Sequence, residues 1–124
     1  MKAAAVTVLI TGFFATPCLS AESPALVFKG KLLSEKHCSR CHVVDPLKPF
    51  TGISSTPSFK LLVTALNDWE ERFQSFNARL PHQSIVRFED EEPDPDVEDL
   101  RPPVELKYKD VDALVAYARS LLKE

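Results

Sequence analysis

Two cysteines and a histidine within five residues constrain this chain more than any other feature of its sequence. The run reads Cys38-Ser-Arg-Cys41-His42. On a helical turn, side chains three residues apart lie on the same side of the backbone, so both thiols can bond to one planar group. The spacing therefore predicts one covalently attached haem c, with thioethers from Cys38 and Cys41 and with His42 as the proximal iron ligand.

Three other chemistries use closely spaced cysteines. A plain Cys-x-x-Cys disulfide would not need the adjacent histidine. A zinc site would require a fourth ligand and usually a second paired motif, which the sequence lacks. A thioredoxin-like redox pair occurs in a βαβ context, and no strand-like alternation surrounds these cysteines. Haem attachment is the interpretation that uses all three residues.

The N-terminus has the layout of a secretory signal peptide. Lys2 is followed by a thirteen-residue apolar run from Ala3 to Ala15, by the helix breaker Pro17, and by the small residues Ser20 and Ala21. These features correspond to the charged region, the apolar region and the cleavage site of such a leader. The sequence therefore predicts export to the periplasm or secretion.

Cleavage would remove residues 1–21 and leave 22–124 as a single haem domain with two cysteines, because Cys18 is lost. Loss of Lys2 changes the net charge from −3 to −4. A membrane anchor is the main alternative, but the apolar run is shorter than the roughly 18 residues a span needs. Lipoprotein attachment at Cys18 is another, but Pro17 stands where a small residue is wanted.

The composition limits what the remaining domain can be. Its length fits one small domain, and 44% hydrophobic residues is too many for a disordered chain. The negative charge does not favour a nucleic acid as partner. For a haem domain we expect other redox proteins as partners, and we expect a monomer. A haem would add a large apolar surface to a small core, so the apoprotein is expected to fold poorly.

Helical periodicity predicts four helices. By residue number these are 24–37, 56–66, 68–80 and 110–123. Thr56 and Pro57 are expected to open the second helix, and Asp68 with Glu71 to cap the third. The last helix is clearly amphipathic, and its natural partner is the first helix, which it can approach closely at Gly30. No segment sustains a period of two, so the expected fold is all-α, a small bundle of about four helices around the haem.

Three segments resemble the monohaem class I cytochromes c. They are residues 30–42 with the haem motif, Thr56-Pro57-Ser-Phe59, and the helix from Asp110 to Leu121. The resemblance implies that the first and last helices cross at a glycine and an aromatic residue, here Gly30 and Tyr117. An aromatic residue usually stands four positions before the first haem cysteine. Here that residue is Ser34, so a looser helix contact is expected.

The chain departs from this family on the distal side of the iron. The family's distal ligand is a methionine, but Met1 is the only methionine in the sequence and belongs to the predicted leader. Arg101-Pro102 stands where relatives carry Met-Pro. His82 is the only histidine after the motif and is the leading replacement, because neutral imidazole is a good iron ligand. The alternative is an exposed histidine in a turn.

Other distal arrangements compete with His82. His37 directly precedes the first haem cysteine and cannot easily reach the opposite face. Lys107, Tyr108 and Lys109 stand before the last predicted helix and could reach the iron. The iron could also remain open and five-coordinate.

The distal ligand decides the chemistry. Two histidines give a six-coordinate, low-spin iron suited to one-electron transfer, at a lower potential than methionine ligation would give. An open site would instead bind a small molecule, as in a sensor or a peroxidase-like protein. A peroxidase would need a distal base and a charged donor, for which His82, Arg79 and Arg101 are candidates. The sequence favours an electron carrier over an enzyme.

Two further predictions concern residues near the haem. Pro57 stands where the resembling family often has a proline near the proximal histidine, which implies that its carbonyl accepts the Nδ1 proton of His42 and fixes the ring; alternatively, it only opens the helix. Trp69 is either a core residue or, with Arg72 and Arg79, a contact for the haem propionates.

Residues 89–99 carry eight acids and no base. This density predicts a solvated, non-helical loop. Because the rest of the domain is then net positive, the acidic loop either orients the protein towards a partner or only aids solubility. Calcium binding by Asp94, Asp96 and Glu98 is conceivable, but the segment lacks the glycine turn of calcium-binding loops.

Overall fold

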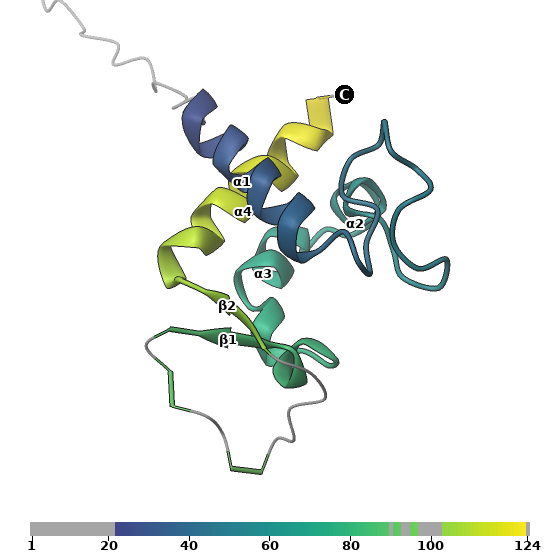
Figure 1. Ribbon diagram of the computed structural model, residues 1–124. Coiled ribbons are helices and arrows are strands. Elements are labelled where there is room, and N and C mark those ends of the chain that lie inside the picture. Colours follow the sequence, from purple (N-terminus) through teal and green to yellow (C-terminus); the bar gives the residue numbers. More distant parts are fainter. Residues whose placement is uncertain (1–21, 90, 93–94, 97–102, 124) are drawn as a thin grey trace, which may run out of the picture.

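The computed structural model describes residues 22–89, 91–92, 95–96 and 103–123. Two long helices, α1 (Pro24–His37) and α4 (Tyr108–Ser120), cross each other in Figure 1. Two short helices and three 3₁₀ turns complete the helical part: α2 (Phe59–Ala65), α3 (Trp69–Gln74), η1 (Phe76–Ala78), η2 (His82–Ser84) and η3 (Leu121–Lys123). The predicted signal peptide with Cys18 lies outside the described residues, as does Arg101-Pro102.

Gly30 allows α1 and α4 to cross at close range. A Cβ atom at Gly30 would lie 1.8 Å from the backbone oxygen of Ala113 and 2.8 Å from Cβ of Tyr117. No side chain other than hydrogen fits in this space, so the helix backbones meet almost directly. The expected crossing at Gly30 and Tyr117 is confirmed.

Two buried hydroxyl groups reinforce the crossing. Ser34 has no exposed surface, and its hydroxyl donates to the Gly30 carbonyl at 2.8 Å. The small polar side chain is thus satisfied within its own helix at the position where the family usually has an aromatic residue. The Tyr117 hydroxyl donates to the carbonyl of Val44 at 2.8 Å, which ties α4 to the chain just after the cysteine motif.

The expectation of an all-α fold is wrong, because a small parallel sheet joins the two segments that flank the acidic stretch. Strand β1 (Val86–Phe88) pairs with β2 (Val104–Leu106), with Phe88 opposite Leu106. Both of these side chains are buried in the core. Each strand has three residues, which is too short to display the period-two alternation from which strands are recognised.

The sheet attaches the segment that carries His82 to the start of α4. Turn η2 leads directly into β1, and β2 leads into α4, as Figure 1 shows. The Val104 N–H donates to the Ile85 carbonyl at 2.8 Å, and the Glu89 N–H donates to the Leu106 carbonyl at 3.0 Å. The backbone around His82 is thereby fixed relative to the crossed helices.

Two helix ends in the structure differ from the prediction: the start of the second helix and the end of the third. Helix α2 begins three residues after Thr56, because Ser58 rather than Thr56 is its N-cap and accepts a hydrogen bond from the Leu61 N–H at 3.1 Å. Asp68 is the N-cap residue of α3, as predicted, but its side chain makes no capping hydrogen bond, since both carboxylate oxygens accept from Nε of Arg72 at 2.9 Å. Helix α3 ends at Gln74, earlier than the sequence suggested.

An aromatic cluster fills the space beneath the crossed helices. Phe73 packs edge-on against Phe59, with ring centroids 4.9 Å apart, and against Trp69 at 6.0 Å. The Arg119 guanidinium covers the Trp69 ring at 5.8 Å. Trp69 is therefore part of this packing, which agrees with the core role among its two predicted roles.

The glycine at the crossing supplies the first prediction. Gly30→Ala should lower the free energy of unfolding, because the new methyl group would collide with the backbone of Ala113. Overpacking costs about 1–3 kcal/mol, which outweighs the gain of about 1 kcal/mol in helix propensity. Urea unfolding measures the difference. Lys36→Ala, at an exposed position on the same helix, is the control and should change stability by less than about 0.5 kcal/mol. Equal stability of Gly30→Ala and the wild type would contradict the prediction.

Candidate functional site

The cysteine motif forms one tight turn at the end of α1. The Cys38 N–H donates to the Ser34 carbonyl at 2.8 Å. The N–H groups of Cys41 and His42 both donate to the Cys38 carbonyl, at 3.1 and 2.9 Å. Both thiols are free and partly buried. The turn thus brings the three motif residues into one short, hydrogen-bonded unit.

Gly52 holds the following loop against this turn. Its φ is +83°, a backbone conformation that glycine adopts without strain. A Cβ atom here would lie 2.8 Å from the carbonyl carbon of His42 and 3.0 Å from the Cys41 carbonyl oxygen. The next residue, Ile53, donates its N–H to that same oxygen at 3.0 Å. The role of Gly52 could not be predicted from the sequence, because a positive φ has no sequence signal beyond the glycine itself.

The backbone carbonyl of Pro57 fixes the orientation of the His42 ring. Its Nδ1 lies 2.7 Å from the Pro57 carbonyl oxygen, as the sequence suggested. A carbonyl oxygen can only accept, so Nδ1 carries the proton and the lone pair of the neutral ring is on Nε2. Phe59 lies against the ring with centroids 5.6 Å apart, and its N–H donates to the Val43 carbonyl at 3.0 Å. His42 is therefore oriented to ligate a metal through Nε2.

The structure brings His82 opposite His42. The two ring centroids are 6.0 Å apart, and the ring planes differ by only 4°. Flat groups in direct contact approach to about 3.5–4.0 Å, so the separation is wider than ordinary stacking. The two histidines are 40 residues apart in the chain, and the fold alone brings them together.

This separation fits two imidazoles that share one metal ion. A metal–imidazole bond is about 2 Å long, and a ligating nitrogen is roughly 1 Å from the centre of its ring. Two such ligands on opposite sides of one ion would place the ring centres about 6 Å apart. The thiols of Cys38 and Cys41 stand beside His42 in one turn. The described residues therefore fit an iron porphyrin bound through two thioethers and two imidazoles.

The surroundings of His82 are largely apolar. Phe76 meets the His82 ring edge-on, with centroids 5.4 Å apart, and Phe76 in turn contacts the buried ring of Phe88 at 6.5 Å. Burial is the main reason that the pKa of His82 is lowered, and the nearby His42 lowers it further. His82 is therefore a neutral imidazole at pH 7, which is the form that binds metals.

Within the described part of the chain, Nδ1 of His82 is buried and has no hydrogen-bond partner. The backbone of His82 is held more firmly, since its N–H donates to the Arg79 carbonyl at 2.8 Å. The two histidines of the site thus differ in how their rings are supported. Phe76, which lies within the predicted third helix but carries no sequence signal for this role, is the ring that packs against His82.

The protonation of the cysteines bears on the alternative redox-pair chemistry. Burial raises the pKa of Cys38 to about 12, and the neighbouring Cys41 contributes to this rise. Thioredoxin-like pairs instead depend on a thiol whose pKa is lowered, because the thiolate is the reactive form. Cys38 is a protonated thiol at neutral pH, which does not favour a redox-active pair.

Two of the other predicted distal ligands, Lys107 and Tyr108, contact other side chains. Lys107 forms an ion pair with Glu89 at 3.1 Å. Tyr108 stacks on Phe88, with centroids 4.1 Å apart, and donates to Glu91 at 2.8 Å. Lys109 is exposed on α4, and His37 lies at the last position of α1, before the motif turn.

The two arginines considered for the propionates have protein partners. Arg72 binds Asp68. A terminal nitrogen of Arg79 lies 3.4 Å from a Glu71 oxygen and 3.3 Å from the Ser75 hydroxyl. Nε of Arg79 is buried and finds no acceptor among the described residues, so part of this side chain remains available to an anionic group.

The described residues contain no group of three or more histidine, cysteine, aspartate or glutamate side chains arranged to hold a metal ion. Of the suggested calcium ligands, Asp94 and Glu98 lie outside the described residues, and only Asp96 is described. None of the helices in the described part of the chain has the length and apolar character of a membrane span.

Comparison with known proteins does not assign a family. Scans against protein-family models, curated proteins and solved structures each return no match. The site therefore has to be interpreted from its own geometry.

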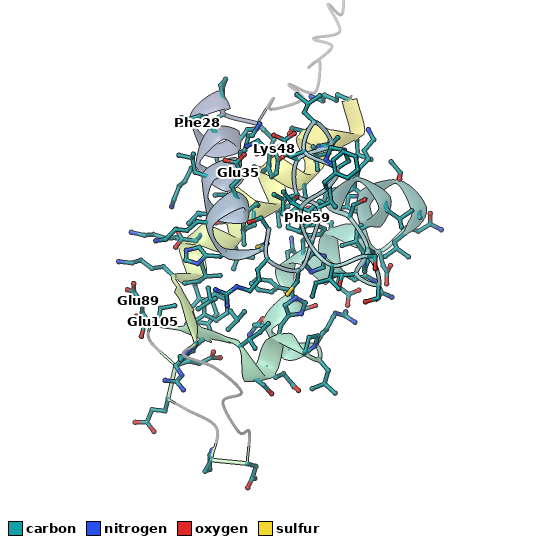
Figure 2. All side chains as sticks on the ribbon, turned by 45° about the vertical axis from the view of Figure 1, so that its right-hand side comes forward. Phe28, Glu35, Lys48, Phe59, Glu89 and Glu105 are labelled. Atoms are coloured by element: carbon teal, nitrogen blue, oxygen red, sulfur yellow. The ribbon has the colours of Figure 1, made fainter. Side chains whose placement is uncertain are left out.

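Two ion pairs fasten the loop after the motif to α1. Lys31 and Asp45 are 3.0 Å apart, and Lys48 and Glu35 are 2.8 Å apart and point towards each other in Figure 2. Asp45 is buried and also accepts from the Leu47 N–H at 3.0 Å. The hydrogen bond from Lys31 is the main reason that the pKa of Asp45 is lowered. The burial of Asp45 could not be predicted from the sequence, since nothing local distinguishes it from a surface aspartate.

The lowered pKa of Asp45 predicts a specific pH dependence. A carboxyl group whose pKa is lower in the folded state stabilises the fold above its unfolded pKa of about 3.9, and this contribution disappears as the pH falls through the folded pKa. Asp45→Asn should therefore be less stable than the wild type by about 1–3 kcal/mol at pH 7, and the difference should shrink below about pH 4.

Urea unfolding between pH 2 and pH 7 measures this difference. Glu35→Gln, in the more exposed ion pair, is the control and should cost less than about 1 kcal/mol. A difference between Asp45→Asn and the wild type that stays constant over the whole pH range would contradict the prediction.

Proposed function

We propose that this chain is an exported monohaem c-type cytochrome that carries single electrons. Cys38 and Cys41 attach the haem, His42 is the proximal iron ligand and His82 is the distal ligand. The observation that carries the proposal is the pair of parallel imidazole rings, 6.0 Å apart, beside a Cys-x-x-Cys-His turn. This combination supports a six-coordinate haem iron.

The residues around the two rings suit electron transfer better than catalysis. When bound, the haem supplies an iron that gains or loses one electron. The Pro57 carbonyl and Phe59 orient His42, and Phe76 packs against His82. Held rings change little between oxidation states, and two imidazole ligands leave no free coordination position for a substrate. We therefore propose an electron carrier rather than an enzyme.

The resemblance to class I cytochromes c supports the same conclusion. The crossing at Gly30 and Tyr117 that this resemblance implied is present. The family's methionine is missing, and histidine takes its place in the proposal. Because methionine ligation raises the haem potential, we expect this haem to be more reducing than its methionine-ligated relatives.

The localisation and the partners follow from the sequence. The leader at residues 1–21 suits haem attachment outside the cytoplasm, so we propose a periplasmic or secreted protein. Residues 89–99 concentrate eight acids, which leaves the rest of the domain net positive. Such a charge distribution orients a protein as it approaches a charged partner. We propose that this monomer exchanges electrons with other redox proteins.

Covalent attachment is tested first. In a host that assembles c-type cytochromes, the wild-type protein should be coloured and heavier than the processed chain by one haem. The double variant Cys38→Ser/Cys41→Ser should lose the covalent haem, because no thiol remains to form a thioether. Mass spectrometry under denaturing conditions measures this. Ser39→Ala, inside the same motif, is the control and should keep the haem. A colourless wild-type protein with the mass of the bare chain would refute the proposal.

The distal ligand is tested by spectroscopy. The oxidised wild-type protein should be low-spin, and His82→Ala should convert it to high-spin, because a strong ligand is lost. Gln83→Ala, an exposed neighbour in the same turn, should remain low-spin. Since the ring planes differ by only 4°, the low-temperature EPR spectrum should be rhombic rather than dominated by one strongly anisotropic feature. A low-spin spectrum that persists in His82→Ala would exclude His82 as the ligand.

A further inference from the structure

The two imidazole rings of the site are held with unequal strength. His42 follows directly after Cys41, and its Nδ1 donates to the Pro57 carbonyl at 2.7 Å. His82 lies in a three-residue 3₁₀ turn, and its buried Nδ1 has no partner among the described residues. The difference is one of ring support, because both backbones are hydrogen-bonded.

This difference has a direct effect on metal binding. A hydrogen-bond acceptor behind a ligating histidine fixes the ring and increases its basicity, and losing such an acceptor costs about 10–100-fold in metal affinity. His42 has this support at 2.7 Å. The backbone of Arg79 lies near the His82 ring but forms no hydrogen bond with its Nδ1. In addition, His42 is anchored through the neighbouring cysteines. The bond to His82 is therefore the weaker of the two.

The aromatic surroundings of His82 favour a small uncharged molecule over a charged one. The edge of Phe76 faces the His82 ring, at 88° to its plane, and Phe88 behind it is 1% exposed. The nearest basic side chain along the chain is Arg79, whose terminal nitrogen lies 3.4 Å from Glu71 and whose buried Nε has no acceptor among the described residues. An anion would have to lose its hydration beside these apolar rings, whereas a neutral diatomic molecule carries no such cost.

We propose that the reduced protein reversibly binds a neutral diatomic ligand, carbon monoxide or nitric oxide, in the position that His82 leaves. This inference rests on the proposed haem and its two histidine ligands. The iron–nitrogen bond to His82 breaks and a bond from the diatomic ligand to the iron forms, while the bond to His42 remains. With carbon monoxide the iron keeps its oxidation state.

Carbon monoxide binding to the reduced holoprotein tests the proposal. In the wild type, the binding rate should reach a plateau as the carbon monoxide concentration rises, because His82 must leave first. In His82→Ala the rate should rise linearly and exceed the wild-type plateau by at least about tenfold. The spectra of the two carbon monoxide complexes should be the same, since His42 is the remaining ligand in both.

Two phenylalanine variants separate the local effect from general loosening. Phe76→Leu removes the ring that packs against His82 and should raise the plateau rate several-fold while the oxidised protein stays low-spin. Phe50→Leu is the matched control, because Phe50 is fully exposed in the loop after the motif, and it should leave the plateau unchanged. Equal effects of the two substitutions would contradict a specific role of the His82 pocket.

The possible failures are distinguishable. A low-spin, six-coordinate haem that does not bind carbon monoxide would overturn this inference and leave the electron-carrier proposal intact. Different spectra for the wild-type and His82→Ala complexes would also overturn it, since they would mean that His42 rather than His82 is displaced. A preparation without covalent haem would refute the proposed function itself.

Discussion

The close contact between α1 and α4 at Gly30 determines where both halves of the site can lie. Helix α1 ends directly at the cysteine motif, so the position of α1 sets the position of His42. Helix α4 holds the chain after the motif through Tyr117 and holds the His82 segment through the sheet that precedes it. Both histidines are therefore positioned relative to the same pair of crossed helices.

Features with a strong local signal could be predicted from the sequence. The bounds of α1 and the close approach at Gly30 follow from short patterns, and the carbonyl of Pro57 next to His42 was implied by the resemblance to class I cytochromes c. The sheet could not be predicted, because its strands are three residues long and their pairing is non-local. A local hydrogen bond explains the later start of α2, where Ser58 rather than Thr56 accepts from a backbone N–H.

In the candidate site, too, some features have a local sequence signal and others depend on the tertiary fold. The motif residues were recognisable, and His82 was selected by elimination as the only histidine after the motif. Its distance and parallel orientation relative to His42 depend on the tertiary fold. The supporting contacts of Gly52, Phe76 and Asp45 were also beyond sequence reasoning, since each acts through residues that are distant in the chain or through backbone geometry.

The parallel pairing of β1 with β2 has a consequence for how this protein can vary. The pairing fixes the two ends of the intervening acidic stretch at opposite ends of one small sheet, because the strands run in the same direction. Lengthening a loop between fixed ends costs little free energy, because the entropy of closure rises only slowly with length. The stretch can therefore be exchanged or extended as a unit while the histidines keep their places, so under the proposed function partner preference can diverge independently of the haem.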